Sequence, residues 1–105
     1  MKIIGVEKLE DCFDGTSAYA YHFDQPWTRQ AIQRLATFGK LDYFADFPRP
    51  FYRVRGAGGL QMKGVEGLQH CRVVLPADRH ERFRLELEEW LTPPIVIPLQ
   101  AGTQA

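Results

Sequence analysis

The chain lacks the motifs on which most recognisable enzyme chemistry depends. Its 105 residues contain only two cysteines and three histidines, and none has the Cys-x-x-Cys or His-x-x-x-His spacing of a metal site. The one glycine-rich stretch, residues 55–59, precedes a predicted strand, whereas a phosphate-binding loop leads into a helix. No nucleophile motif is present. The sequence therefore predicts a non-catalytic domain with no metal and no cofactor.

An excess of one charge and a long apolar run are also missing. The 13 Lys and Arg residues balance 13 Asp and Glu residues, which argues against bulk attraction to nucleic acid or to an anionic membrane. No apolar run approaches the roughly 18 residues of a membrane span, and the first residues reach charge too soon for a signal peptide. We expect a cytoplasmic protein in which Cys12 and Cys71 stay reduced. One domain over residues 1–92 is expected, followed by an extended, proline-containing tail over residues 93–105.

What the chain does contain is a pattern of strands separated by two helical segments. Residues 26–39 and 78–91 place apolar side chains three and four positions apart, and a proline follows the second segment at position 93. Strands are predicted for residues 2–9 and 17–23, and for three stretches within residues 51–75. The fold expected is an α+β two-layer sandwich, in the order β-β-α-β-β-β-α. An antiparallel sheet of about five strands would carry both helices on one face.

The three strands within residues 51–75 segregate polar from apolar side chains. A three-residue loop at 57–59 places Arg55 opposite Gln61 and Arg53 opposite Lys63. A two-residue turn at 66–67 then places Lys63 opposite His70. One face thus carries a row of Arg53, Lys63 and His70, beside a row of Arg55, Gln61 and Arg72. The other face is apolar, with Tyr52, Val54, Leu60, Met62, Cys71, Val73 and Leu75.

This charged face is the sequence's best functional indication. Residues 49–72 hold five cations against one carboxylate, while residues 1–24 hold two lysines against five acidic residues. Such a face is either neutralised by the chain's own carboxylates or meets an anionic partner. The intramolecular candidates are Asp42, Asp46, Glu66 and the acidic residues of the N-terminal strands. The candidate partner-binding residues are Arg49, Arg53, Arg55, Lys63, His70 and Arg72. The partner would be an anionic small molecule or an acidic protein surface; no RNA-recognition signature is present, so nucleic acid is not expected.

A second unusual feature is the aromatic stretch at residues 41–52, which holds five aromatic residues and a Pro-Arg-Pro. These aromatic residues either seal the edge of the core or line a pocket, for which the candidates are Tyr43, Phe44, Phe47 and Phe51. The pocket version supports an alternative function as a small-ligand protein or an enzyme. In it an arginine, Arg49 or Arg53, would hold a carboxylate or phosphate beside Tyr43, and Asp46 or His70 would move a proton.

A third interpretation concerns the tail, where Ile95-Val96-Ile97 stands among prolines. This segment either packs on its own chain or pairs with the sheet edge of a second copy, which would make the protein a structural homo-oligomer subunit. We therefore expect a monomer or a homodimer, and no membrane association. The leading hypothesis is a small binding or accessory domain with a basic sheet face.

Overall fold

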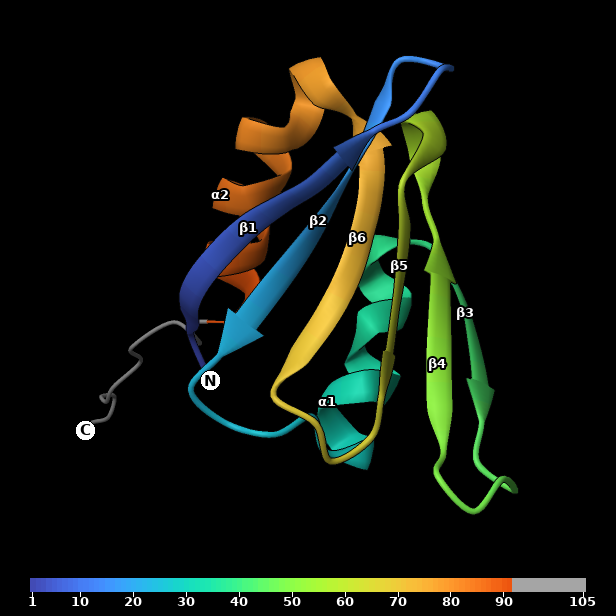
Figure 1. Ribbon diagram of the computed structural model, residues 1–105. Coiled ribbons are helices and arrows are strands. Elements are labelled where there is room, and N and C mark those ends of the chain that lie inside the picture. Colours follow the sequence, from blue (N-terminus) through green and yellow to red (C-terminus); the bar gives the residue numbers. More distant parts are fainter. Residues whose placement is uncertain (92–105) are drawn as a thin grey trace, which may run out of the picture.

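The computed structural model describes residues 1–91 of the chain (Figure 1). The expected tail, residues 93–105, and its strand-pairing segment lie outside the described residues. The strands are β1 (Ile3–Asp11), β2 (Thr16–Phe23), β3 (Lys40–Phe44), β4 (Phe51–Arg55), β5 (Gln61–Val65) and β6 (His70–Pro76). The helices are α1 (Arg29–Arg34) and α2 (His80–Leu91), and the short 3₁₀ turns are η1 (Leu35–Phe38), η2 (Ala57–Gly59) and η3 (Ala77–Arg79).

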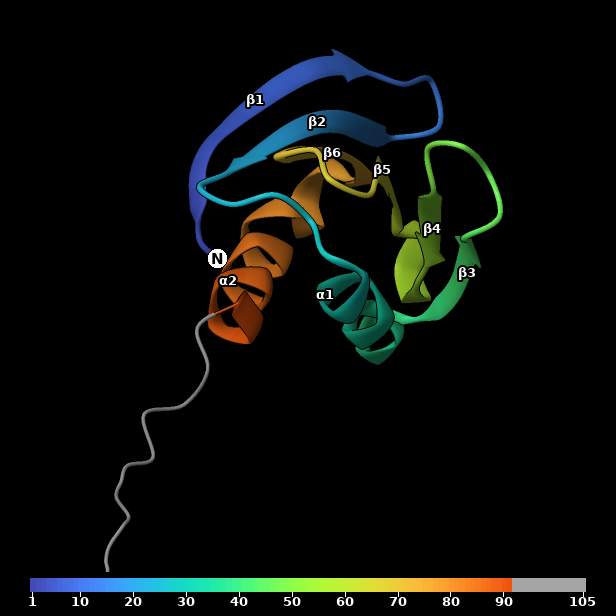
Figure 2. The ribbon, with the colours of Figure 1, turned by 90° about the horizontal axis from the view of Figure 1, so that it is seen from below.

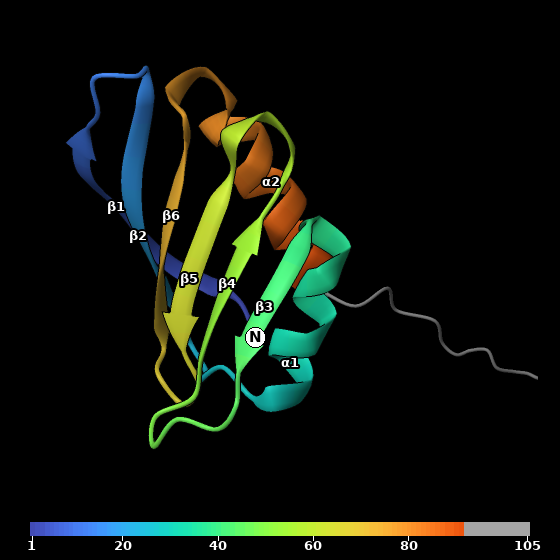
Figure 3. The same ribbon diagram turned by 90° about the vertical axis from the view of Figure 1, so that its right-hand side faces the viewer.

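The strands form one antiparallel sheet in the order β1-β2-β6-β5-β4-β3. Both helices lie on the same side of this sheet, which twists and curves around them (Figures 2 and 3). The predicted α+β sandwich is confirmed, with six strands in place of about five. The additional strand is β3, in a stretch that the sequence analysis treated as an aromatic linker. It forms because Leu41 and Tyr43 face Val54 and Tyr52 and so extend the apolar face of the sheet.

The apolar side of the sheet is buried as its alternation predicts. All seven residues assigned to that face by sequence are buried, and β2 adds Tyr19, Tyr21 and Phe23. The helices contribute Ile32, Phe83, Leu87 and Leu91, and Trp27 closes the core between β2 and α1. Each large apolar side chain removed from water contributes about 1.5–3 kcal/mol, so this one-sided core is what holds the two layers together.

The register between β5 and β6 differs from the prediction by two residues. Lys63 lies opposite Arg72, and Met62 lies opposite Val73, because the connecting loop is longer than a two-residue turn. Trp27 holds that loop: its backbone N–H donates to Leu68 O over 2.9 Å, and Gly67 N donates to Trp27 O over 2.8 Å. A shift of two residues preserves which side chains share a face, so the segregation of polar from apolar residues survives. The hairpin between β4 and β5 has the predicted register, with Arg53 opposite Lys63.

Helix α2 is fastened to β2 by an aromatic contact at its first residue. His80 stacks on Tyr19, with ring centroids 3.6 Å apart and planes 3° from parallel. The hydroxyl of Tyr21 lies 2.8 Å from His80 Nε2. Burial raises the pKa of Tyr21 far above its ordinary value, so the phenol keeps its proton in this hydrogen bond with the imidazole. Burial also lowers the pKa of His80, and Arg84 and Lys8 lower it further, against a raising effect of Glu81.

We predict that replacing Gly64 by alanine destabilises the fold. A Cβ at this position would lie 2.6 Å from Oη of the buried Tyr52, so strand β5 or the tyrosine must move. Overpacking of this kind costs roughly 1–3 kcal/mol in the free energy of unfolding, which urea denaturation measures. Gly5→Ala is the matched control, because its Cβ would meet nothing closer than 3.9 Å. Adding Tyr52→Phe to Gly64→Ala removes the nearest atom and should restore part of the loss; no restoration would contradict this explanation.

We also predict that the free energy of unfolding decreases as the pH is lowered, because His80 becomes protonated. Because the pKa of His80 is lower in the folded state than its ordinary value of 6.5, the folded protein favours the neutral ring. The stabilisation is therefore complete above that ordinary value and is lost as the pH falls through the folded-state pKa. His80→Gln should flatten the dependence of the unfolding free energy on pH in this range. A pH dependence that His80→Gln leaves unchanged would refute the assignment.

Candidate functional site

The side of the sheet without helices, here called the open face, carries the side chains that alternate with the core. Three cations lie directly opposite one another on its central strands, Arg53 on β4, Lys63 on β5 and Arg72 on β6. We call these three the cation row. His70 was predicted to lie in this row with Arg72 beside it; the two-residue shift in register puts Arg72 in the row instead. Like charges at directly opposed positions disfavour a strand pair by roughly 0.2–1 kcal/mol, so the row requires compensation.

Carboxylates of the same chain compensate the two ends of the row. Asp42, opposite Arg53 on β3, accepts hydrogen bonds from Arg53 at 3.1 and 3.4 Å and from Arg55 at 3.2 Å. On the other side Arg72 lies 3.3 Å from Glu10 Oε1 of β1. In residues 1–91 no carboxylate forms an ion pair with Lys63, the middle member. Intramolecular neutralisation is therefore real but partial: within the described residues two carboxylates pair with three of the four cations, and Lys63 is left unpaired.

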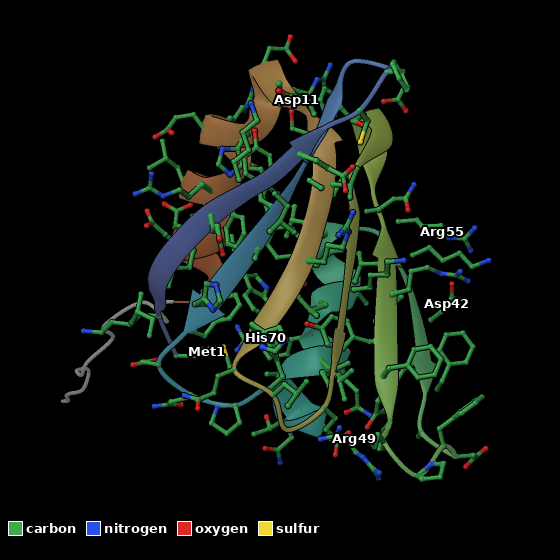
Figure 4. The ribbon with its side chains drawn as sticks, in the orientation of Figure 1. Met1, Asp11, Asp42, Arg49, Arg55 and His70 are labelled. Atoms are coloured by element: carbon green, nitrogen blue, oxygen red, sulfur yellow. The ribbon has the colours of Figure 1, made fainter. Side chains whose placement is uncertain are left out.

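The Asp42 carboxylate is held in its charged form by this arrangement. The hydrogen bond from Arg53 is the largest cause that keeps the pKa of Asp42 below its ordinary value, and the charges of Arg55, Arg53 and Lys40 add to it against the opposing effect of desolvation. All three hydrogen bonds end on a single oxygen, Oδ2. Each guanidinium group has five N–H donors, so both arginines retain donors beyond those that Asp42 uses. Figure 4 shows Asp42 and Arg55 together at the β3–β4 side of the sheet.

The remaining candidate cations lie around the row. His70 lies opposite His22 of β2, with ring centroids 6.2 Å apart, and both are exposed on the open face. Arg49 is exposed in the loop between β3 and β4, near the ends of those strands and apart from Arg55 (Figure 4). The structure thus gathers five of the six candidate residues on one face and places Arg49 at its border.

The aromatic residues of the 41–52 stretch divide between the two faces. Phe44, Phe47 and Phe51 pack together, with ring centroids 4.6 Å apart for Phe44 and Phe51 and 5.1 Å for Phe47 and Phe51. Phe47 remains 54% exposed, so these three residues, here called the phenylalanine patch, present apolar surface to solvent. Phe44 and Phe51 lie opposite each other on β3 and β4, where they continue the alternation that puts Asp42 and Arg53 on the open face.

Tyr43 lies on the other side of the sheet. It is opposite the buried Tyr52, its hydroxyl donates to Glu66, and Arg29 Nε donates to that hydroxyl over 3.2 Å. Tyr43 and Arg53 therefore do not share a pocket, which was the geometry imagined for a small-ligand site. Two hollows in the described structure are lined by residues of other regions, one beside the start of α2 and one between α1 and the end of α2.

The position of Asp42 was the part of the site that sequence analysis did not locate. Asp42 was one of several possible carboxylates, and without strand β3 it had no predicted register against Arg53. The signal was present in residues 40–44, where Lys40 and Asp42 alternate with Leu41 and Tyr43 in the pattern of a half-buried strand. The Pro-Arg-Pro that follows obscured this pattern because it marks the segment as a connection.

We predict opposite effects on stability for the two kinds of charge in this site. Asp42→Asn removes the carboxylate between Arg53 and Arg55 and should lower the Tm, whereas Lys63→Gln removes the unpaired middle cation and should leave the Tm unchanged or raise it. Because the groups are exposed, both effects should be small and should shrink in high salt. Thermal unfolding at low and high salt measures them. A clear loss of Tm in Lys63→Gln would show that Lys63 is a structural partner.

Within residues 1–91 no helix combines the length and apolar character needed to cross a membrane. The same residues contain no group of three or more His, Cys, Asp or Glu side chains placed to hold a metal ion. Comparison with protein-family models, curated proteins and solved structures finds no match to this chain.

Proposed function

We propose that the protein is a non-catalytic binding domain whose open face meets an acidic segment of a partner protein. The observation that carries this proposal is the cation row: three opposed cations on neighbouring strands, with Lys63 unpaired among the described residues. A sheet that gained nothing from this arrangement would be more stable without it. Binding of an acidic group supplies the compensation that Asp42 and Glu10 leave incomplete.

The surroundings of the row favour a protein partner over a small anion. The row lies on exposed strands, and neither the hollow beside the start of α2 nor the one between α1 and the end of α2 includes any of its residues. A small ligand is usually held in a concave site that surrounds most of its surface. The phenylalanine patch adjoins Arg53 on strands β3 and β4 and adds exposed apolar area. Aromatic residues and arginine are the types enriched where proteins meet, so the combination fits a segment with both acidic and apolar side chains.

The charge distribution across the face also gives the partner an orientation. Beyond Arg72, the next residues in the same line across the sheet are Ala20 of β2 and Glu7 of β1. Glu10, also on β1, pairs with Arg72. The open face is therefore positive at its centre and negative at the β1 edge. An acidic segment is attracted to β4, β5 and β6 and repelled from β1, which sets the register of binding as well as its rate.

The test is a titration of isotopically labelled protein with synthetic peptides, followed by amide NMR shifts. A peptide that contains glutamate and phenylalanine should change the amide chemical shifts of residues in β4, β5 and β6, and its binding should weaken at higher salt. A matched peptide with every glutamate replaced by glutamine should bind much less. Lys63→Gln should raise the Kd for the acidic peptide about fivefold, equivalent to roughly 1 kcal/mol of binding free energy.

Arg82→Gln provides the control, because it removes the same charge from the 85%-exposed Arg82 side chain on α2. The variant should bind as the unaltered protein does. Inorganic phosphate and a single-stranded oligonucleotide test the other anions. Tighter binding of either, equal binding of the two peptides, or absence of shifts on the open face would each overturn the proposal.

A further inference from the structure

The end of the molecule that carries the β1–β2 turn presents an exposed phenylalanine on a fixed backbone. Phe13 is the most exposed large apolar side chain of the described residues, at 112% of its reference area. Its turn is braced by Asp14 Oδ1, which accepts hydrogen bonds from Thr16 N at 3.1 Å and from Thr16 Oγ1 at 2.6 Å. None of the described residues covers the ring, so a large apolar surface remains in water on a hydrogen-bonded turn.

The same end carries a groove of about 540 Å³ beside the start of α2. Its apolar lining includes Phe38, Leu60, Leu75 and Phe83, and its charged lining includes Arg79 and Arg82. The volume falls within the range of roughly 300–1,000 Å³ typical of ligand sites, so one aromatic ring fits inside it. The turn and the groove are neighbours, because Ala77 N of η3 donates to Gly15 O of the turn over 3.3 Å.

The charges at the two features are complementary. Arg82 lies 3.5 Å from Glu86 and is thereby compensated, and Asp78 also lines the groove. Arg79 forms no ion pair with a carboxylate of residues 1–91, and its guanidinium packs so closely on Gly58 that a Cβ there would lie 2.7 Å from it. Asp14, next to Phe13, also lacks a cationic partner in the described chain. The turn thus offers an apolar ring beside an unpaired anion, and the groove offers apolar walls beside an unpaired, positioned cation.

We propose that two copies of this chain associate end to end about a two-fold axis, each placing Phe13 in the groove of the other. A two-fold interface uses the same patch on both subunits, so a projection and a complementary hollow side by side satisfy its requirement for self-complementarity. Both contacts form at once and the assembly closes as a dimer. Asp14 of one copy then faces Arg79 of its partner, twice. This interface lies at the end of the sheet with the β1–β2 turn, whereas the β3–β4 loop lies at the opposite end (Figure 1). Dimerisation there is therefore independent of the function proposed for the open face.

The area involved predicts weak, reversible association. Two buried phenylalanines contribute about 150–250 Å² each, and with their surroundings the interface stays near the lower limit of roughly 1,000 Å² for a specific contact. Sedimentation equilibrium of the full chain from about 10 μM to about 1 mM should therefore show a monomer–dimer equilibrium. A protein that remains monomeric over this range would overturn the proposal.

Substitutions at the turn separate this interface from any other. Phe13→Ser should weaken dimerisation at least about tenfold while the Tm stays unchanged, because the ring contributes nothing to the monomer's core. Phe47→Ser is the matched control, since it removes another exposed phenylalanine from the opposite end and should leave the equilibrium unaltered. A dimer that survives Phe13→Ser, or one that only Phe47→Ser dissociates, would place the interface elsewhere and refute this one.

A double-mutant cycle tests the ionic contact. Asp14→Asn keeps an oxygen for the turn, and Arg79→Gln removes only the contact of an exposed guanidinium with Gly58, so neither should unfold the protein. Each should weaken dimerisation, and the double variant should be little weaker than the worse single variant, because both remove the same pair. Fully additive effects would show that Asp14 and Arg79 do not meet across the interface and would contradict the proposed geometry.

Discussion

The hydrogen bonds made by the backbone of Trp27 determine how the central strands of the sheet are aligned. Its N–H and its carbonyl clasp the loop between β5 and β6 at Leu68 and Gly67, while its ring is buried against Phe23 and Tyr52. Phe23 N also donates to Gln69 O over 2.7 Å, so the end of β2 holds the same loop. The loop length that results puts Arg72 opposite Lys63. The cation row on the open face is therefore set by contacts of the core, on the other side of the sheet.

The one-sided placement of the helices decides where chemistry can occur. Burial raises the pKa of Tyr52, and it raises that of Cys71 to about 12, but both side chains belong to the apolar face beneath the helices. Their shifts follow from packing, since desolvation is the largest cause in each. On the open face the one shift of comparable interest is that of Asp42, whose pKa is lowered because it is bound to arginines. Ion pairing at a surface thus replaces burial as the dominant electrostatic effect there, and it suits recognition better than proton transfer.

The sequence predicts which face of the sheet each side chain occupies better than it predicts which residues lie opposite one another on neighbouring strands. Alternation with a period of two assigns Arg53, Lys63 and Arg72 to one side and Val54, Met62 and Val73 to the other, and these assignments are confirmed. Alternation cannot distinguish registers that differ by two residues, which is why His70 was placed where Arg72 lies. The deciding contact joins Trp27 to residues 67–68, some forty positions away, and leaves no periodic signal. Strand β3 was missed for a related reason: at five residues it is short, and its pairing with β4 depends on a connection that contains two prolines.

The pairing of Asp42 bears on how an acidic partner would bind at the open face. If Asp42 occupied all the donors of Arg53 and Arg55, a partner would have to displace it, and binding would cost the stability that the ion pairs contribute. A single oxygen accepts all three bonds, and Asp42 lies at the β3 end of the row, beyond Arg53 and away from Lys63. On the proposed function a second carboxylate therefore binds between Arg53 and Arg72, over Lys63, and adds to the existing pairs. Asp42 then orients the arginines and does not compete for them, so the contacts that stabilise the free sheet also prepare it for its partner.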